Sequence, residues 1–544
     1  MTGGPQDRPD DTGRPAPPHD PTPLLDALRA DLAPFTVDAV EELLGPVAAA
    51  ALHREQAVPA LRALGELPVA GRPVTPLADP VTTLVRAFVL GRPVRRGDLD
   101  RALPRLTADG AEHLGLVAAA GAADDDAVHA RVDLRPYRAV DGTGTVDWWL
   151  ASDLGELATG RGLRPDHVLG VGGASTTLAQ VTVRRPRRRA LDVGTGCGIQ
   201  ALHAARHSDA VVATDLSARA LAFARFNAAL AGVALDLRRG SMLEPVAQDE
   251  PFDLVVSNPP FVITPRAPGA VAGATGAGAP LPVFEYRDGG RAGDDLVADL
   301  VRDVGSVLAP GGVAQLLGNW EHRRGEGWQE RVGAWLDASG LDGWVVQREV
   351  QDPAEYAETW LRDGGTTPER DPGGWAAAYG AWLDDFAARQ VEAVGFGLVL
   401  LRRPTTPDRP ALRRLEERTG PVQQPLGPHL AAALDAHDLL AATDDDALLA
   451  RALTVAPDVT EERHLVPGAA DPTVVLLRQG GGFGRVVRAG TALAGLVGAC
   501  DGELTVGQVV GGIAVLLDVP VDALRAELVP QVRELVADGL LLPA

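Results

Sequence analysis

A short apolar run that ends in an amide, two prolines and an aromatic ring stands in the middle of the chain, in 253-DLVVSNPPFVI-263. The apolar residues 254-LVV-256 predict a buried strand, and proline stops a strand because it has no backbone N–H to donate. The residues at this strand end that could do chemistry are Asn258, Pro259, Pro260 and Phe261.

The two prolines leave carbonyl oxygens as the main-chain polar groups at this strand end, which suits a ligand that donates hydrogens. The side-chain oxygen of Asn258 and the backbone carbonyl of Pro259 can accept both hydrogens of one planar –NH2 group. Holding both hydrogens positions the nitrogen and favours its pyramidal, nucleophilic form. Phe261 offers a flat face on which a planar substrate can stack. We therefore expect an acceptor site for a planar amine or amide; the alternative is a tight turn with Phe261 in the core.

A glycine-rich turn lies upstream, in 189-RALDVGTGCGIQALHAARH-207. A strand is predicted to end at Val193 and a helix to follow the turn. Glycines in such a turn let the backbone approach a ligand closely, and the helix N-terminus adds the positive end of its dipole. A second strand, 211-VVATD-215, ends in Asp215, whose carboxylate can accept hydrogen bonds from both hydroxyls of a ribose. The two strands predict a site for a nucleotide-like ligand.

The spacing of the glycines narrows the choice of ligand. Dinucleotide sites normally show G-x-G-x-x-G, whereas this turn reads G-x-G-x-G and Asp192 stands on the strand just before it. A carboxylate at that point can hold a cationic amino group rather than a pyrophosphate. S-adenosylmethionine (SAM) fits, because it has a ribose and an amino-acid end but no phosphate, and NAD fits less well. Ligands of open parallel sheets bind beyond the carboxyl ends of the strands, which puts Asn258 beside the sulfonium methyl.

The motifs DVGTGCG, TD and SNPPF, in this order, resemble those of the class I SAM-dependent methyltransferases. They look like the small methyltransferase group, whose acceptor motif is [Asn/Asp]-Pro-Pro-[Phe/Tyr/Trp]. That group includes release-factor glutamine methyltransferases and amino methyltransferases of rRNA guanine and of adenine. The resemblance covers roughly 165–405 and implies a Rossmann-like α/β fold with SAM as the cofactor. The cofactor-binding residues that it implies here are Asp192, Gly194, Thr195, Gly196, Gly198, Asp215 and Leu216.

One departure from the family's pattern concerns the adenine of SAM. Relatives often carry an acidic residue after the third strand, where this chain reads 240-GSMLEP-245. Ser241 and the backbone of Met242 are the local candidates for the adenine contacts.

Two further groups of polar residues have less specific patterns. The stretch 285-EYRDGGRAGDDLVADLV-301 is similar to the loop and helix that follow the acceptor motif in the family. Arg287 and Asp288 are expected to cap that helix, with substrate contact as the alternative. His203 and His207 stand at i and i+4 on the helix after the glycine turn, where we expect a solvated face rather than a metal pair.

Three functions remain open at this point. The first is methylation of an exocyclic amine of a nucleobase in RNA (rRNA or tRNA), which Phe261 favours because the glutamine enzymes usually have tyrosine there. The second is methylation of a protein glutamine amide. The net charge of -22 is more compatible with a protein acceptor than with RNA, which is a polyanion. The third is a SAM-binding module without catalysis, against which the intact SNPPF motif argues.

Length, charge and cysteine content bound the rest of the chain. At 544 residues the chain is too long for one core, and about three domains are expected. No apolar run is long enough for a membrane span, and the two cysteines lack metal-ligand spacing. We therefore expect a cytoplasmic protein with no metal and no membrane contact, and its oligomeric state stays open.

The pattern along the chain divides it into four segments. A disordered tail is predicted over 1–22, a mostly helical module over 23–139, the methyltransferase domain over 140–405, and a helical, winged-helix-like module over 406–544. The last module is predicted from the strand-like 540-LLLP-543 and from a helical stripe of apolar residues before it, Leu524, Leu528, Val532 and Leu535.

Overall fold

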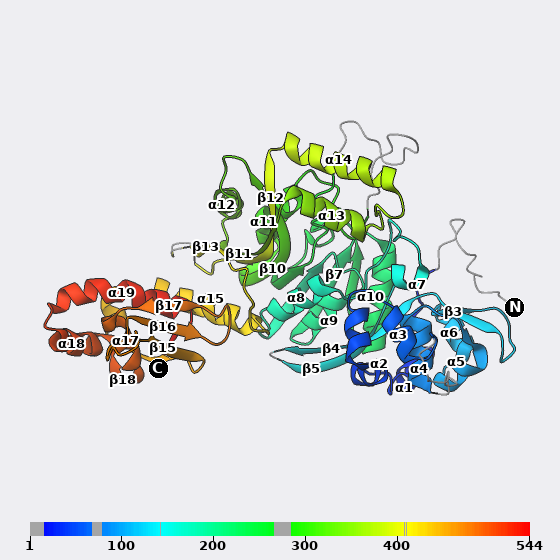
Figure 1. Cartoon of the computed structure of the whole chain (residues 1–544), viewed down its shortest axis with the longest axis horizontal. Helices are drawn as coiled ribbons and strands as arrows, with labels where there is room; N and C mark the ends of the chain where they lie inside the picture. The colour runs from blue at the N-terminus through cyan, green and yellow to red at the C-terminus, as the bar shows by residue number, and fades with distance from the viewer. Residues whose placement is uncertain (1–15, 68–78, 142, 266–283, 407–408, 410) are drawn as a thin grey trace. The chain divides into compact units, whose positions relative to one another are not determined.

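The computed structural model describes residues 16–67, 79–141, 143–265, 284–406, 409 and 411–544 (Figure 1). Most of the tail predicted over 1–22 lies outside these residues. The chain divides into two compact units. The first comprises Met1–Leu178, Pro186–Leu341 and Glu349–Arg403, and the second comprises Ala179–Arg185, Asp342–Arg348 and Pro404–Ala544. The four predicted segments and their boundaries stay predictions.

An eight-stranded, mostly parallel sheet has the strand order β13-β11-β12-β10-β9-β6-β7-β8. Only β12 runs antiparallel to its neighbour β10 among the strand pairs whose direction is recorded for this sheet in the described part of the chain. The predicted α/β sheet is therefore confirmed. Its strands are β6 (Arg187–Val193), β7 (Ser208–Asp215), β8 (Asp236–Arg239), β9 (Phe252–Ser257), β10 (Leu308–Arg323), β11 (Asp342–Gln351), β12 (Val391–Arg402) and β13 (Arg413–Glu417).

The strands that carry the motifs form where apolar runs predicted them. The run 254-LVV-256 is buried in β9, which is the fourth strand of this sheet in chain order. In the sheet, however, β9 lies directly beside β6, with Ser257 opposite Val193. The carboxyl ends of β6 and β9 are therefore neighbours, although the sequence separates them by two further strands.

Helices α9 to α14 connect these strands and pack on the sheet, and α8 precedes β6 (Figure 1). The segment that separates β11 from β12 is helical. The helices are α8 (Gly173–Val181), α9 (Ile199–Ala205), α10 (Ala218–Ala231), α11 (Asp295–Asp303), α12 (Trp328–Ser339), α13 (Pro353–Asp363) and α14 (Pro372–Ala388).

The N-terminal part of the first unit contains the predicted helices and, in addition, strands that the sequence did not predict. Leu28 and Phe35 from this part belong to one buried apolar cluster with Phe223 and Phe226 of α10. This part of the chain therefore shares its core with the sheet domain. Its elements are α1 (Thr22–Asp31), α2 (Val37–Leu52), α3 (Val58–Ala63), α4 (Pro80–Leu84), α5 (Arg96–Ala102), α6 (Thr107–His113), the sheet β1 (Val94–Arg95), β3 (Ala127–Ala130), β2 (Val117–Ala119), and the hairpin β4 (Asp133–Asp141) and β5 (Gly144–Ser152).

The hairpin β4–β5 corrects the expectation for His203. That side chain is 2% exposed rather than solvated, and its Nε2 lies 2.9 Å from the hydroxyl of Tyr137 on β4. Its ring also packs edge-on against Trp148 of β5. The prediction of a solvated His203 was wrong because its neighbours come from a hairpin, and the spacing of residues on a helix does not reveal such neighbours. The described part of the chain contains no cluster of three or more His, Cys, Asp or Glu residues that could hold a metal ion.

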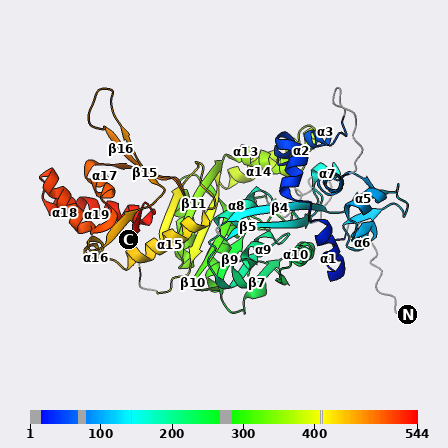
Figure 2. The same ribbon diagram turned by 90° about the horizontal axis from the view of Figure 1, so that it is seen from below.

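The second unit contains helices and two small sheets of its own. The predicted apolar stripe on α19 is buried, and the helix ends two residues before Gly539. Helices α18 and α19 lie side by side in it (Figure 2). Its winged-helix-like character stays a prediction. The elements are α15 (Gly427–Ala441), α16 (Asp445–Leu449), α17 (Thr491–Gly498), α18 (Val506–Leu517), α19 (Val521–Ala537), the sheet β18 (Asp501–Thr505), β14 (Ala452–Val455), β19 (Leu541–Pro543), and the sheet β15 (Val459–His464), β16 (Val474–Gln479), β17 (Val486–Ala489).

No helix within the described residues is both long enough and apolar enough to cross a membrane.

Candidate functional site

The turn after β6 needs its glycines for two different reasons. The φ values are 71° at Gly194, 57° at Gly196 and 91° at Gly198, and residues other than glycine rarely adopt such values. A Cβ on Gly198 would lie 3.1 Å from Cα of Ala224, so this glycine lets α9 pack closely on α10. A Cβ on Gly194 or Gly196 would meet nothing within 4 Å. These two glycines therefore border open space where a ligand can approach the backbone.

Asp192, the residue before the last one of β6, stabilises this turn through hydrogen bonds of its side chain. The side chain is 1% exposed, and its Oδ2 accepts hydrogen bonds from Thr195 Oγ1 at 2.6 Å and from the backbone N–H of Ala201 at 3.0 Å. Its other oxygen, Oδ1, is buried with no hydrogen-bond partner. Burial raises the pKa of Asp192 to about 7. One carboxylate oxygen thus shapes the loop, and the other remains available to a cationic amino group.

Asp215 at the end of β7 is also tied to backbone. Its Oδ2 accepts from the N–H of Gly196 at 2.9 Å, and its Oδ1 accepts from the N–H of Ser217 at 2.8 Å. Burial raises the pKa of this carboxyl above its usual value, against these hydrogen bonds. Each oxygen keeps a second lone pair, so both can still accept from a pair of hydroxyls. The next residue, Leu216, is 64% exposed and presents an apolar surface beside the carboxylate.

The turn that carries Ser241 and Met242 lies against the end of β7. The N–H of Gly240 donates to the backbone oxygen of Asp215 at 3.0 Å, and the hydroxyl of Thr214 lies 3.4 Å from the backbone oxygen of Met242. Met242 has a positive φ of 47°, which is uncommon for a residue with a side chain. The structure therefore brings these two predicted residues close to Asp215.

The acceptor motif follows the end of β9. The hydroxyl of Ser257 donates to the backbone oxygen of Val193 at 2.8 Å and fastens this strand end to the start of the glycine turn. Asn258 is half-buried, and its Oδ1 has no hydrogen-bond partner and is shielded from solvent. Buried polar atoms in native proteins are nearly always paired, so this oxygen is suited to a donor that the free chain does not supply.

The aromatic ring of the motif is partly committed to packing. Phe261 is half-buried and meets Phe396 of β12 edge to face, with 6.4 Å between the ring centres. Pro259 is buried and Pro260 is half-buried. Phe261 is thus neither fully in the core, as a simple turn would place it, nor fully free.

The segment 284–290 runs beside the acceptor motif and corrects one expectation. The N–H of Val262 donates to the backbone oxygen of Arg287 at 2.8 Å, and Phe261 forms an isolated antiparallel bridge with Asp288. Neither Arg287 nor Asp288 caps α11, whose N-terminal flanking residue is Asp294. The prediction that they cap the helix is therefore wrong, because both are paired with the acceptor segment instead.

A residue that the sequence analysis missed contacts the chain just after the acceptor motif. The N–H of Ile263 donates to the hydroxyl of Tyr356 on α13 at 2.9 Å. Nothing in the sequence of 351–391 indicates which strand end this helix contacts.

A family model for methyltransferases matches the part of the chain that carries the glycine turn and the acceptor motif. Residues 170–274 match the model described as "Methyltransferase small domain". Residues 32–131 and 431–543 match two models described as "Domain of unknown function", DUF7059 and DUF7782. The chain therefore contains a methyltransferase small domain between two domains whose functions the models do not name.

Curated relatives match about a quarter of the chain. A release factor glutamine methyltransferase of Deinococcus radiodurans is 41% identical over 143 residues, which is 26% of this chain and 49% of that protein. The enzyme of the same name from Bordetella pertussis is 34% identical over 142 residues, 25% of this chain and 50% of that protein. The chain thus spans about half the length of these relatives.

A solved structure of a T. thermophilus 16S rRNA methyltransferase bound to AdoMet and guanosine is 16% identical, with a TM-score of 0.24, over 46% of this chain and 58% of that one.

The cofactor implied by the domain match is SAM, and the residues present fit it. The unpartnered Oδ1 of Asp192 suits the amino group of its methionine end, and the open space beside Gly194 and Gly196 leaves room for that end. Asp215 has lone pairs for ribose hydroxyls, and the exposed Leu216 suits a flat apolar base.

Proposed function

We propose that this chain transfers a methyl group from SAM to a planar –NH2 group held by Asn258 and Pro259. One observation carries the proposal: the buried, unpartnered Oδ1 of Asn258 stands at a strand end that is hydrogen-bonded to the start of the glycine turn. A hydrogen-bond acceptor without a partner is costly in a folded chain, and an acceptor –NH2 would supply the missing hydrogen.

On the cofactor side, SAM supplies an electrophilic methyl group on a sulfonium sulfur. Asp192 would hold the amino group of SAM, and Asp215 would hold its ribose. Leu216 would cover one face of the adenine, and Ser241 and the backbone of Met242 would meet its edge. The backbone of the turn would follow the methionine end, through Gly194, Thr195, Gly196 and Gly198.

On the acceptor side, Asn258 Oδ1 and the backbone oxygen of Pro259 would each accept one hydrogen of the –NH2 group. The nitrogen would gain positive charge as its lone pair bonds the methyl carbon, while the carbon–sulfur bond breaks and the sulfur leaves as a neutral thioether. Both hydrogen bonds would therefore strengthen towards the transition state. A strong general base is not needed, because a proton can leave the nitrogen after the transfer. Phe261 would stack on the plane of the acceptor. Pro260 would fix the direction of the backbone between Pro259 and Phe261.

For the identity of the acceptor we favour a protein glutamine amide. The sequence alone placed a nucleobase amine of RNA first, on the ground of Phe261. The names of the curated relatives support the glutamine alternative better, since they are release factor glutamine methyltransferases. The net charge of -22 also suits a protein acceptor better than a polyanion.

The test is to incubate the full chain with SAM that carries a radiolabelled methyl group and with separated protein, RNA and DNA from its own cells. Label in the protein pool supports the glutamine proposal. Label in the RNA pool would overturn that choice of acceptor while leaving methyl transfer intact. If no pool is labelled although calorimetry shows that the chain binds SAM, the chain is instead a SAM-binding module without catalysis.

A further inference from the structure

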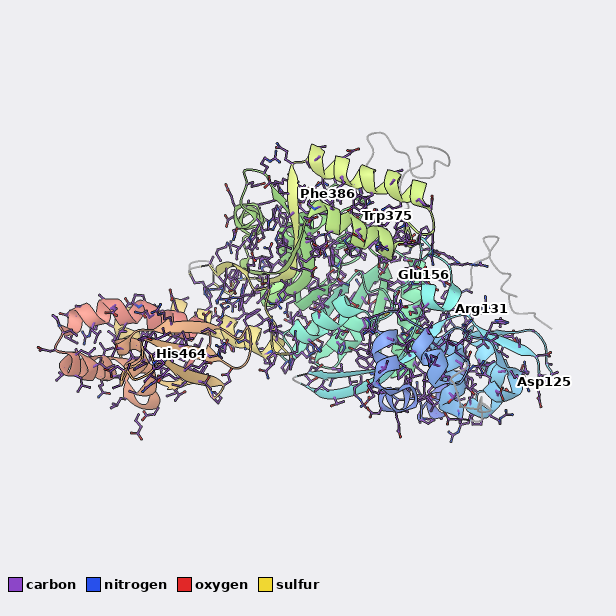
Figure 3. The ribbon with its side chains drawn as sticks, in the orientation of Figure 1. Asp125, Arg131, Glu156, Trp375, Phe386 and His464 are labelled. Carbon is purple, nitrogen blue, oxygen red and sulfur yellow. The ribbon has the colours of Figure 1, made fainter. Side chains whose placement is uncertain are left out.

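The helices α13 and α14 pack on the chain that follows the acceptor motif. They lie side by side in both views (Figures 1 and 2), and Trp375 and Phe386 mark the two ends of α14 (Figure 3). One buried apolar cluster joins these helices to the acceptor segment and to β12. Its members are Val262, Ile263, Tyr356, Ala357, Leu361, Ala378, Trp382, Phe386, Val391 and Val394.

Tyr356 is the polar member of this cluster and is 0% exposed. Its hydroxyl accepts two hydrogen bonds, from the N–H of Ile263 at 2.9 Å and from Asn319 Nδ2 at 2.8 Å. Burial raises the pKa of Tyr356, so the hydroxyl stays neutral. The ring cannot shift freely, because it packs against four other rings whose centres lie 5.6 to 6.1 Å away, those of Trp360, Trp382, Phe386 and Phe396.

The acceptor motif is therefore fixed at both ends. At its start, Ser257 is hydrogen-bonded to the backbone oxygen of Val193 on β6. At its end, the N–H of Ile263 is hydrogen-bonded to Tyr356 on α13. The first bond ties the motif to the cofactor turn, and the second ties it to a helix that contributes none of the predicted site residues.

A second link joins α13 to the same region. Arg287, whose backbone oxygen pairs with Val262, donates from Nη1 to Asp363 Oδ2 at 2.6 Å and to the backbone oxygen of Trp360 at 2.8 Å. The guanidinium also lies over the ring of Phe284, 4.3 Å from its centre. Because Arg287 is only 8% exposed, this contact is shielded from solvent and holds the C-terminal end of α13 against segment 284–290.

We propose that Tyr356 is a positioning residue for methyl transfer, and that α13 sets the place of the acceptor motif through Tyr356 and through the Arg287–Asp363 pair. This inference rests on the function proposed above. Transfer to a held nitrogen depends on in-line geometry, and a displacement of about 1 Å can cost roughly 100-fold in rate. A hydrogen bond at Ile263, two residues after the motif, controls that displacement more directly than a packing contact elsewhere on the helix.

The test compares Tyr356→Phe with Tyr379→Phe in the full chain. Each change removes one hydroxyl from the helical insert, but the hydroxyl of Tyr379 donates to the backbone oxygen of Ala354 at 2.9 Å, so its removal breaks no recorded hydrogen bond to the described acceptor segment. With labelled SAM and a protein extract of its own cells as acceptor, we expect Tyr356→Phe to lower the single-turnover rate roughly 10- to 100-fold. SAM affinity should stay within about twofold, and Tyr379→Phe should keep the wild-type rate.

Hydrogen exchange gives a second readout that needs no acceptor. The amide of Ile263 should exchange about tenfold faster in Tyr356→Phe and unchanged in Tyr379→Phe. Asp363→Asn, at a half-exposed side chain, should lower the rate of transfer even if Tyr356→Phe folds poorly.

Equal rates in the two tyrosine variants, or an unchanged Ile263 amide, would overturn the positioning role. If the wild-type chain transfers no label at all, the proposed function fails, and the exchange result still decides whether Tyr356 holds the segment.

Discussion

Replacing Asn258 by alanine should separate the chemistry of the acceptor site from the stability of the fold. In the free chain Asn258 Oδ1 accepts no hydrogen bond, so its removal breaks no intramolecular hydrogen bond. Asn258 is also only half-buried, and we expect the free energy of unfolding to change by less than about 1 kcal/mol.

The rate of methyl transfer should respond much more strongly. One preorganised contact to a group that gains charge in the transition state is worth about 2.7–4 kcal/mol, which is a 100- to 1,000-fold fall in rate. Because the contact strengthens towards the transition state, turnover should fall with little change in SAM affinity. Asn258→Asp keeps an acceptor oxygen at the same place and should retain more activity than Asn258→Ala.

Single-turnover transfer, SAM calorimetry and a thermal melt of both variants check this prediction. A wild-type rate in Asn258→Ala would refute the assignment of Asn258 to the acceptor site. A loss of rate that follows a loss of stability in both variants would show that Asn258 is only a turn residue.

Three further predictions concern the cofactor side and the N-terminal part. Asp215→Ala should weaken SAM binding by about 1–3 kcal/mol, and an unchanged calorimetric affinity would remove Asp215 from the site. The folded-state pKa of Asp192 lies near 7, above the ordinary value of 3.8, so the folded chain holds a proton that the unfolded chain releases in this window. Stability should therefore fall as pH rises from about 4 to about 7, and urea melts of Asp192→Asn should lose that slope; an equal slope in both proteins would contradict the assignment. Deleting residues 1–139 should unfold the sheet domain, because Phe35 shares a core with Phe223; a cooperative melt of the shortened chain at the wild-type temperature would show otherwise.

The part of the site that lies on strands and tight turns could be predicted from the sequence. The run 254-LVV-256 is too apolar for a surface, and the prolines after it can only end a strand, so β9 and its end were predictable. The glycine turn was predictable for a different reason. Glycine adopts a positive φ easily, and Gly194 and Gly196 both have one.

Contacts that depend on distant segments could not be predicted. The burial of His203 depends on a hairpin with Tyr137, and the hold on Ile263 depends on Tyr356 from a helix far along the chain. Periodicity gives the face of a helix but not the partner of that face. For Asp192 the sequence predicted contact with a ligand but not the structural role, because the bonds of Oδ2 to Thr195 and Ala201 depend on the closed shape of the turn.

The most direct test of methyl transfer to a planar –NH2 group is to identify the atom that receives the methyl. The labelled product of the full chain would be digested to single residues and the methylated residue identified by tandem mass spectrometry. We expect the methyl on the side-chain amide nitrogen of a glutamine. A methyl found on oxygen, sulfur or carbon would contradict the acceptor chemistry assigned to Asn258 and Pro259.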